Sequence, residues 1–318
     1  MTSIYPQEAT ARSRWIAERR GAKNPVRSDR AYAQLLERER MEDGTIRDVA
    51  TIFLTNRECP WKCVMCDLWR NTTPITEASI SKQIEIALTE LPSAERATVL
   101  KLYNSGSFFD PHAIARSEWP AIAEMCNQFD HVIVECHPRL VNGNVLRFAD
   151  MLNGTFEIAM GLETCHPEAL EKINKRITVA DFKNAARFLR SNNISVRTFL
   201  LVGVPFITDD EQEKWLRESI RLASNAGSNI NSLIPTRMGH GALDELARAG
   251  EFKEPKLHHL EAAFEFGLAE SAGRILADTW DIERFCKCNR CAVGRRDRLV
   301  RMNLSQEIAP RLECDCGC

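Results

Sequence analysis

The alternation of short β-branched runs with amphipathic segments constrains the fold of this chain more than any other feature. Six apolar runs have the length and composition of strands, and several are nearly continuous, as expected of strands covered on both faces. The six runs are VATIFLT (49–55), ATVLKLY (97–103), HVIVEC (131–136), FEIAMGLE (156–163), VRTFLLVG (196–203) and NINSLIP (229–235). This rhythm indicates βα units around a parallel sheet.

The segments between these runs have the three- and four-residue apolar spacing of helices that cover a sheet. Two such stripes are Ile80, Ile84, Ala87, Leu88 and Leu91, and Phe182, Ala185, Ala186 and Leu189. Thr178 and Asp181 resemble a capping box with Asp in place of Glu, which predicts a helix start. Six βα units are too few for a closed eight-fold barrel. They predict an α/β fold, either an open partial barrel or a doubly wound sheet, with functional loops at the carboxyl ends of the strands.

The regions on either side of this rhythm differ in composition. Residues 1–47 include RAYAQLLERERME and predict an N-terminal extension of one or two polar helices that end near Gly44. Residues 48–270 form the predicted core. Residues 271–318 contain many cysteines and arginines and few apolar residues, so they need a metal or a docking surface to hold a shape.

Charge and hydropathy exclude two classes of protein. The 42 Lys and Arg residues are balanced by 44 Asp and Glu residues, which excludes binding to nucleic acid by bulk electrostatics but leaves room for a local basic patch. The longest apolar runs are far shorter than a membrane span. The N-terminus has no apolar segment typical of a secretory signal, and Glu8 and Glu18 interrupt its arginines, so we expect a cytoplasmic protein.

Cysteine usage is unusual for such a protein, because nine of the twelve cysteines fall in two clusters. Disulfides are rare in a cytosolic chain, so clustered cysteines indicate metal or iron–sulfur ligation. The other three, Cys126, Cys136 and Cys165, lie among apolar neighbours, and we expect them to be small buried hydrophobic residues.

The first cluster is the string TNRECPWKCVMCDLW, directly after the first predicted strand. Cys59, Cys63 and Cys66 have the spacing C-x₃-C-x₂-C, with no fourth cysteine nearby. Three ligands from one loop can hold three irons of a cubane and leave the fourth iron open to a small molecule. A zinc site is the alternative, and its fourth ligand would have to come from the distant tail.

The CPWKCVMC motif resembles that of the radical S-adenosylmethionine (SAM) superfamily, and the resemblance covers roughly residues 48–270. It implies a partial (βα)6 TIM-type barrel and a 4Fe–4S cluster on the three cysteines. It further implies SAM, bound to the open iron by its amino and carboxylate groups, and a low-potential electron donor. The remaining segments are similar to the elongator-like subgroup of this superfamily.

The resemblance assigns cofactor-binding roles to particular residues. NSGSF (104–108) stands where the family has a GGE-like loop for the SAM amino group, and although it departs from GGE, Ser105 and Gly106 could contribute backbone contacts. Glu135 resembles the strand-three carboxylate of the subgroup. In GLETCHPEALEKINKRIT (161–178), Glu163 would face the ribose, and Lys175 or Arg176 would bind the SAM carboxylate.

Two further residues are placed at the adenine of SAM by the same resemblance. Gly203 belongs to LVGVPFITDDE (201–211), which is similar to a GxP segment that lines the adenine. Met65 replaces the aromatic residue that many members carry before the last cluster cysteine, and a thioether can also pack on a ring. Met65, NSGSFFDP and the terminal CDC resemble the archaeosine-forming subgroup. That likeness suggests a modified base of tRNA as substrate, with a protein partner.

The second cluster combines CKCNRC with CDCGC. Its six thiols belong to Cys286, Cys288, Cys291, Cys314, Cys316 and Cys318, and they could build a Cys₄ zinc site or an auxiliary iron–sulfur cluster. A disordered, reduced tail is the alternative. Between the two stretches, GRRDRLVRMN is expected to be a basic loop that either grips phosphate or is merely solvated. The rival function for the whole chain is a non-catalytic iron–sulfur or zinc protein that carries electrons or binds RNA.

Overall fold

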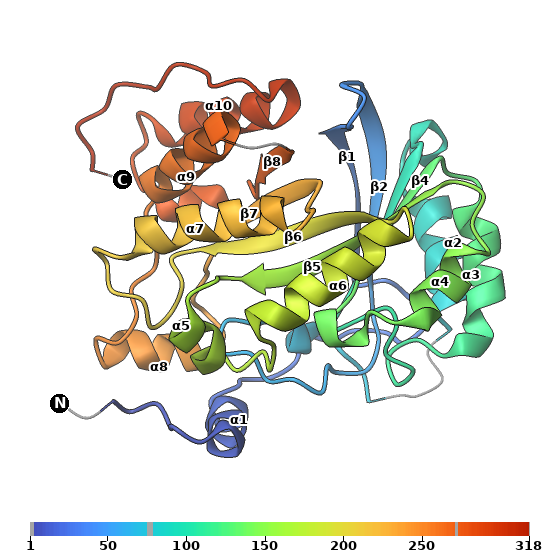
Figure 1. Cartoon of the computed structure of the whole chain (residues 1–318), viewed down its shortest axis with the longest axis horizontal. Helices are drawn as coiled ribbons and strands as arrows, with labels where there is room; N and C mark the ends of the chain where they lie inside the picture. The colour runs from blue at the N-terminus through green and yellow to red at the C-terminus, as the bar shows by residue number, and fades with distance from the viewer. Residues whose placement is uncertain (1–2, 75–78, 271–272, 318) are drawn as a thin grey trace.

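The computed structural model describes residues 3–74, 79–270 and 273–317 as one eight-stranded sheet with helices around it (Figure 1). The strands follow one another in chain order, β1 to β8. They are β1 (Ala33–Arg40), β2 (Ile46–Leu54), β3 (Val99–Asn104), β4 (His131–Glu135), β5 (Thr155–Glu163), β6 (Ser195–Val202), β7 (Ile230–Pro235) and β8 (Arg274–Ala277). β1 pairs with β2 in antiparallel fashion, and all other pairs are parallel.

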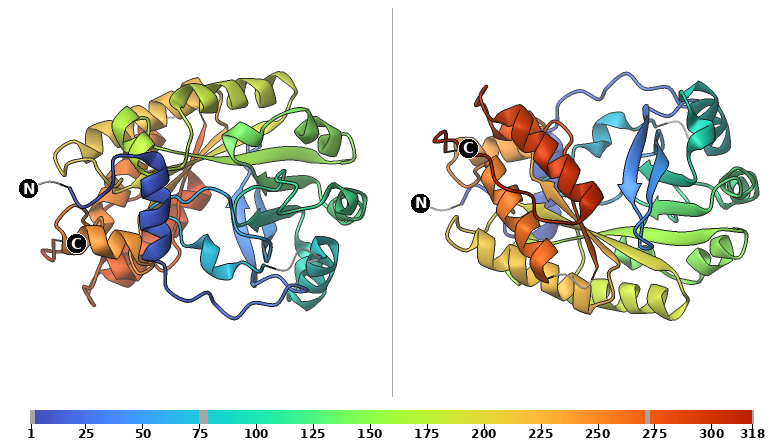
Figure 2. Two further views of the ribbon diagram at one scale, coloured as in Figure 1. Left: turned by 90° about the horizontal axis from the view of Figure 1, so that it is seen from below. Right: turned by 90° about the horizontal axis from the view of Figure 1, so that it is seen from above.

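The sheet is curled into a half-barrel, and most of the helices lie outside it (Figure 2). The helices are α1 (Ala9–Glu18), α2 (Ile80–Glu90), α3 (Trp119–Cys126), α4 (Gly143–Ala149), α5 (Pro167–Lys172), α6 (Val179–Ser191), α7 (Gln212–Asn225), α8 (Ala242–Arg248), α9 (Leu257–Glu270) and α10 (Ala292–Ser305). The predicted α/β partial barrel is therefore confirmed. All six predicted strands are present as β2 to β7, and Thr178 and Asp181 form the predicted capping box of α6.

The two faces of the sheet have opposite chemistry. The outward side chains, such as Ile52, Leu100 and Ile158, join the apolar faces of the helices in the main core. Cys126 and Cys136 belong to this core, and Cys165 is buried elsewhere, so the prediction that these three are buried is confirmed. The inward face is more polar, since charged side chains from β1, β3, β5 and β6 meet inside the curl.

An ion-pair network occupies this interior. Glu39 of β1 accepts from Lys101 of β3 at 2.6 Å and from Arg197 of β6 at 2.5 Å, and Arg197 also binds Glu157 of β5 at 2.6 Å. At most 6% of each of these four side chains is exposed. The network joins the first strand to strands on the far side of the curl.

The N-terminal region corrects one prediction. Residues 33–40, expected to belong to a helix, form β1. The strand is stabilised by contacts with distant parts of the chain. Glu37 and Glu39 both point into the curl and bind Lys101 there, as alternate residues of a strand can. α1 is a helix as expected, and it lies across the end of the sheet where the parallel strands terminate (Figure 2).

The C-terminal region corrects another. The stretch expected to be a basic loop belongs to α10, which packs against β1 and β8. Arg295 and Arg298 of this helix are buried, and they bind Glu261 and Glu265 of α9. Arg295 and Arg298 therefore attach α10 to α9. β8 was also missed, because its four residues are too few to show a periodic pattern.

No helix within the described part of the chain combines the length and the apolar character that crossing a bilayer would require.

Candidate functional site

The three clustered cysteines lie in the loop that follows β2, at the carboxyl end of the strand. The Asn56 side chain ties this loop to the one after β3, because it donates to the Ser105 carbonyl (3.0 Å) and accepts from the Ser105 N–H (3.2 Å). Gly106 has φ +105°, and a Cβ there would lie 3.3 Å from the Cys59 sulfur. The absence of a side chain at Gly106 therefore lets this backbone approach Cys59 closely.

The segment after α5 holds the cysteine loop from the other side. The Val64 N–H donates to the Ile173 carbonyl at 3.0 Å, and the Asn174 side chain donates to the Lys62 carbonyl at 2.8 Å. Asn174, which has φ +63° and is fully buried, was not among the residues predicted from the sequence. Its place in the resembling segment, one residue before Lys175, is the only signal that could have indicated it.

Glu58 links the cysteine loop to the N-terminal region. Its carboxylate binds Arg20 at 2.6 Å, Lys23 at 3.2 Å and also Lys62. Burial alone would raise the pKa of Glu58, but Lys62 and Arg20 outweigh it and lower that pKa to about 2. Residues before the sheet therefore brace the loop that carries the cysteines.

Glu163 and Lys175 form an ion pair of 2.5 Å beside this loop. Glu163 ends β5 with φ +67°, a conformation that side chains rarely adopt and that often marks a functional site. Gly161 makes room for the pair, because a Cβ there would lie 2.0 Å from the Glu163 Oε1 and 2.2 Å from the Lys175 Nζ. Burial would lower the pKa of Lys175, but Glu163 overrides it and raises that pKa.

The three cysteines of the loop are half-buried. Burial raises the pKa of Cys59, Cys63 and Cys66, that of Cys66 to about 12. The ammonium of Lys175 is close enough to Cys59 and Cys63 to oppose this effect on both thiols. A metal must therefore displace protons from the thiols, and the nearby positive charge favours the thiolate form.

Polar atoms without partners gather at the same ends of the strands. Three buried side-chain oxygens have no hydrogen-bond partner among the described residues: Thr55 Oγ1, Asn104 Oδ1 and Thr236 Oγ1. Thr55 directly follows β2, Asn104 is the last residue of β3, and Thr236 directly follows β7. Burial raises the pKa of Glu135, at the end of β4, to about 8. Buried polar groups normally have partners, so this region fits a ligand rich in hydroxyl, amine and carboxylate groups.

Three further residues predicted to bind SAM also contact other parts of the chain. Arg176 is exposed and donates to the Ala9 carbonyl (2.6 Å) and the Ser13 hydroxyl (3.3 Å), so it binds α1. Gly203 has φ +77°, and its Cα faces the ring of Pro255. Met65 packs against a separate apolar cluster that includes Val64.

The cysteines of the tail form a second, more compact group. The sulfur atoms of Cys288, Cys291, Cys314 and Cys316 all lie within 4.8 Å of one another. Cys288 and Cys314 are 3.7 Å apart, and Cys291 and Cys316 are 3.5 Å apart. Four thiolates at about 2.3 Å from one tetrahedral ion have edges of about 3.8 Å, so the group can hold a single metal ion.

The remaining two cysteines of the tail differ from these four. Cys286 lies 3.7 Å from Cys291 and accepts a contact of 3.8 Å from Arg295, but it is outside the compact group. Cys318 lies outside the described residues. The sequence names six candidate ligands, and the fold brings four of them together.

The site is a curled, mostly parallel sheet with three cysteines in the loop after β2. The sequence profile of the radical SAM superfamily matches residues 53–218, which is half of the chain. The chain therefore belongs to the radical SAM superfamily. Membership implies a 4Fe–4S cluster and SAM as cofactors, and an electron donor.

Three archaeal proteins are similar to the chain over much of its length. It is 26% identical to the uncharacterized protein MJ0550 of Methanocaldococcus jannaschii, over 87% of this chain and 83% of that protein. It is 23% identical to archaeosine synthase subunit beta of Methanosarcina acetivorans, over 87% and 84% of the two chains. The same subunit of Thermococcus kodakarensis is 28% identical over 61% of this chain, which spans 63% of that protein.

Two solved structures share the fold. Methylornithine synthase (PylB) aligns with a TM-score of 0.55 and 14% identity, over 93% of this chain and 74% of its own. The Methanocaldococcus infernus Elp3 with an N-terminal deletion aligns with a TM-score of 0.53 and 14% identity, over 74% of this chain and 57% of its own. At such identity these likenesses concern the fold.

Proposed function

We propose that this chain is a radical SAM enzyme that holds its 4Fe–4S cluster on Cys59, Cys63 and Cys66 and acts on a base of tRNA. The observation that carries the proposal is the meeting of the cysteine loop with the Glu163–Lys175 pair and with unpartnered polar atoms at the strand ends. A loop with three thiols and no fourth ligand leaves one coordination position for SAM. The half-barrel supplies the enclosing wall.

Different residues of the site would contact different parts of the cofactors. When bound, the cluster and SAM supply a 5′-deoxyadenosyl radical that abstracts hydrogen from the substrate. In this proposal Lys175 would bind the carboxylate of SAM, and Glu163 would accept a hydrogen bond from its ribose or amine. Thr55, Asn104 and Thr236 offer hydrogen bonds to the rest of the ligand, and the enclosed site excludes water from reactive species.

Similarity supports the class of substrate. The archaeosine synthase subunits named above match this chain over 61% and 87% of its length. Archaeosine is a modified base of tRNA, and a subunit acts with a partner chain. A tRNA base as substrate and a second protein chain as partner are therefore part of the proposal.

The tail is proposed to hold a single zinc ion on Cys288, Cys291, Cys314 and Cys316. In a 4Fe–4S cluster each thiolate binds a different iron, so the thiolates are held apart. These four sulfur atoms lie close enough together to bind one ion. Zinc is the metal that prefers four thiolates in tetrahedral geometry. Of the alternatives left open for the tail, the close grouping of the four sulfur atoms supports zinc over an auxiliary iron–sulfur cluster.

Cys63→Ala tests the cluster assignment. We expect the anaerobically reconstituted variant to lose one 4Fe–4S cluster per chain and all formation of 5′-deoxyadenosine from SAM and dithionite. Cys126→Ala, which changes a buried cysteine of α3 in the main core, is the matched control and should keep both. Formation of 5′-deoxyadenosine by the Cys63 variant would disprove the assignment.

The substrate class needs a second measurement. tRNA isolated from cells that lack this chain carries its substrate base unmodified. Adding it, with the partner chain, should raise formation of 5′-deoxyadenosine and change the mass of one nucleoside. An unchanged nucleoside profile with active SAM cleavage would remove tRNA from the proposal and leave the enzyme class intact.

A further inference from the structure

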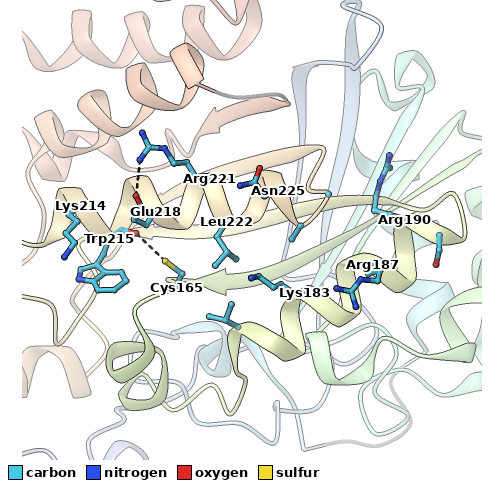
Figure 3. A pocket seen from close by; sticks show the side chains of 14 residues that line it. Cys165, Lys183, Arg187, Arg190, Lys214, Trp215, Glu218, Arg221, Leu222 and Asn225 are labelled. Atoms are coloured by element: carbon cyan, nitrogen blue, oxygen red, sulfur yellow. Dashed lines mark hydrogen bonds and ion pairs between the residues drawn. The ribbon is translucent and has the colours of Figure 1, made fainter.

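A groove runs along the outer wall of the half-barrel between α6 and α7, and it has a volume of about 1240 Å³ (Figure 3). Five cationic side chains line it, against one carboxylate, Glu218. They are Lys183, Arg187 and Arg190 from α6, and Lys214 and Arg221 from α7. This is a strong local excess in a chain whose formal net charge is −2.

The three cations of α6 are exposed and have no carboxylate partner among the described residues. Arg187 contacts only the Asn184 amide oxygen at 3.4 Å, and Arg190 binds the Asn229 side chain at 2.9 Å. Other exposed cations, for example Arg248 and Lys253, are paired with acids. The α6 charges are therefore available to an anionic ligand.

The spacing of these cations follows one face of the helix. Lys183, Arg187 and Arg190 stand at positions i, i+4 and i+7, and a rise of 1.5 Å per residue separates them by about 6 Å and about 4.5 Å along the axis. Like charges four residues apart destabilise a helix. The only acidic residue of α6, Asp181, is used in the capping box and does not offset them.

One end of the groove lies beside the segment that follows β5. Cys165, two residues after Glu163, and Val179, at the start of α6, both line it. At that end the rings of His166 and Trp215 lie 4.4 Å apart, and the Lys214 ammonium is 5.1 Å from the Trp215 ring. Aromatic rings beside a row of cations are typical of surfaces that bind single-stranded nucleic acid.

We propose that this groove binds the phosphate backbone of the RNA that carries the substrate base. The inference rests on the proposed function, since it requires an RNA substrate. The cations of α6 would contact successive phosphates, and the groove would lead the strand toward the carboxyl ends of β5 and β6. This basic surface takes the place of the expected C-terminal one, whose Arg295 and Arg298 are buried.

A triple variant tests the groove, in the full-length reconstituted protein. Lys183→Gln, Arg187→Gln and Arg190→Gln together should raise the Kd for tRNA from cells lacking this chain by about tenfold or more. The slope of log affinity against log salt should fall by about two, at about 0.7 per lost phosphate contact. SAM cleavage without RNA should stay at the wild-type rate, because none of the three residues lies in the proposed cofactor site.

The matched control removes the same charge from paired positions. Arg27→Gln, Arg248→Gln and Lys253→Gln change three exposed cations that each bind an acid, and this triple should bind tRNA nearly as the wild type does. Equal losses in both triples would mean a general charge effect and would overturn the proposal.

Two other outcomes separate the groove from the function. Unchanged tRNA binding by the α6 triple, with wild-type protein still modifying tRNA, would overturn the groove and leave the function standing. Failure of the wild type to bind or modify any tRNA would overturn the RNA substrate and the groove with it. Binding of oligoglutamate that the α6 triple loses, while tRNA binding persists, would assign the groove to an acidic protein segment instead.

Discussion

At the scale of single residues, Glu163 concentrates the most unusual features of the chain. It combines a left-handed backbone, a buried ion pair with Lys175 and a place at the end of β5. Gly161 is required for this arrangement, because any side chain at that position would clash with Glu163 and Lys175. A carboxylate held against the preference of its backbone is the expected mark of a binding residue.

Glu163→Gln should therefore weaken SAM binding by at least about tenfold, because hydrogen bonds to charged groups contribute about 1.5–3 kcal/mol. Cluster content should not change, since the three cysteines keep their loop. Equilibrium dialysis of SAM against the reconstituted protein measures the effect. Glu168→Gln, an exposed position on α5, is the control, and equal SAM affinity in both variants would contradict the role of Glu163.

At the scale of elements, β1 acts as the strand that closes the polar interior. Its Glu39 is the common partner of Lys101 and Arg197, which come from strands on opposite sides of the curl. A buried pair is not by itself a source of much stability, but removing one member leaves buried charge without compensation. The attachment of β1 thus depends on the charge of one carboxylate.

Glu39→Gln should lower the free energy of unfolding at pH 7 by about 3 kcal/mol, measured by urea unfolding of the metal-free protein. Glu42→Gln, exposed and just beyond β1, should change it little. Similar midpoints and slopes for all three proteins would show that the network does not support the strand.

The same element predicts the response to acid. Burial would raise the pKa of Glu39, but Arg197 and Lys101 lower it well below its usual value. Burial would likewise raise the pKa of Glu157, but Arg197 lowers it to about 2. A carboxylate whose pKa is lowered by folding stabilises the folded state at pH values above its pKa in the unfolded chain, about 4.5. That stabilisation is lost as the pH falls toward 2. The difference between wild type and the Glu39 variant should therefore shrink over that range.

At the scale of the whole molecule, the C-terminal region completes the fold. α10 packs against β1 and β8, and Arg298, fully buried, donates to the carbonyls of Ala309 and Pro310. The four grouped cysteines bring the last described residues beside the loop before α10, where the proposed metal ion would join them. Deletion of residues 281–318 would remove this packing as well as the metal site.

Cys314→Ser is a milder test of the tail metal. We expect about one zinc ion per chain to be lost, with a fall in the thermal midpoint, because the metal holds chain segments that have little core of their own. Cys286→Ser should keep its zinc, since Cys286 lies outside the compact group. Zinc and iron analysis of both variants would decide, and equal zinc in the two would contradict the four-cysteine assignment.

Much of this molecule was determined by its sequence alone. The strands β2 to β7 and the start of α6 follow from apolar periodicity and from the capping pair Thr178 and Asp181, which act within a few residues of one another. The cysteine loop could be placed after the first strand of the core for the same reason. The placement of Glu163 and Lys175 near this loop followed from a segment-wide resemblance, and the structure brings the two together.

Only the tertiary structure decided the rest. β1 is a strand because Glu37 and Glu39 meet cations more than sixty residues away, and Arg176 binds α1 although it adjoins Lys175. α10 buries arginines that were expected to lie in a loop, and the cations of the α6–α7 groove come from two separate helices. Apolar burial follows local spacing, whereas a charged side chain takes its place from partners that only the folded chain brings near.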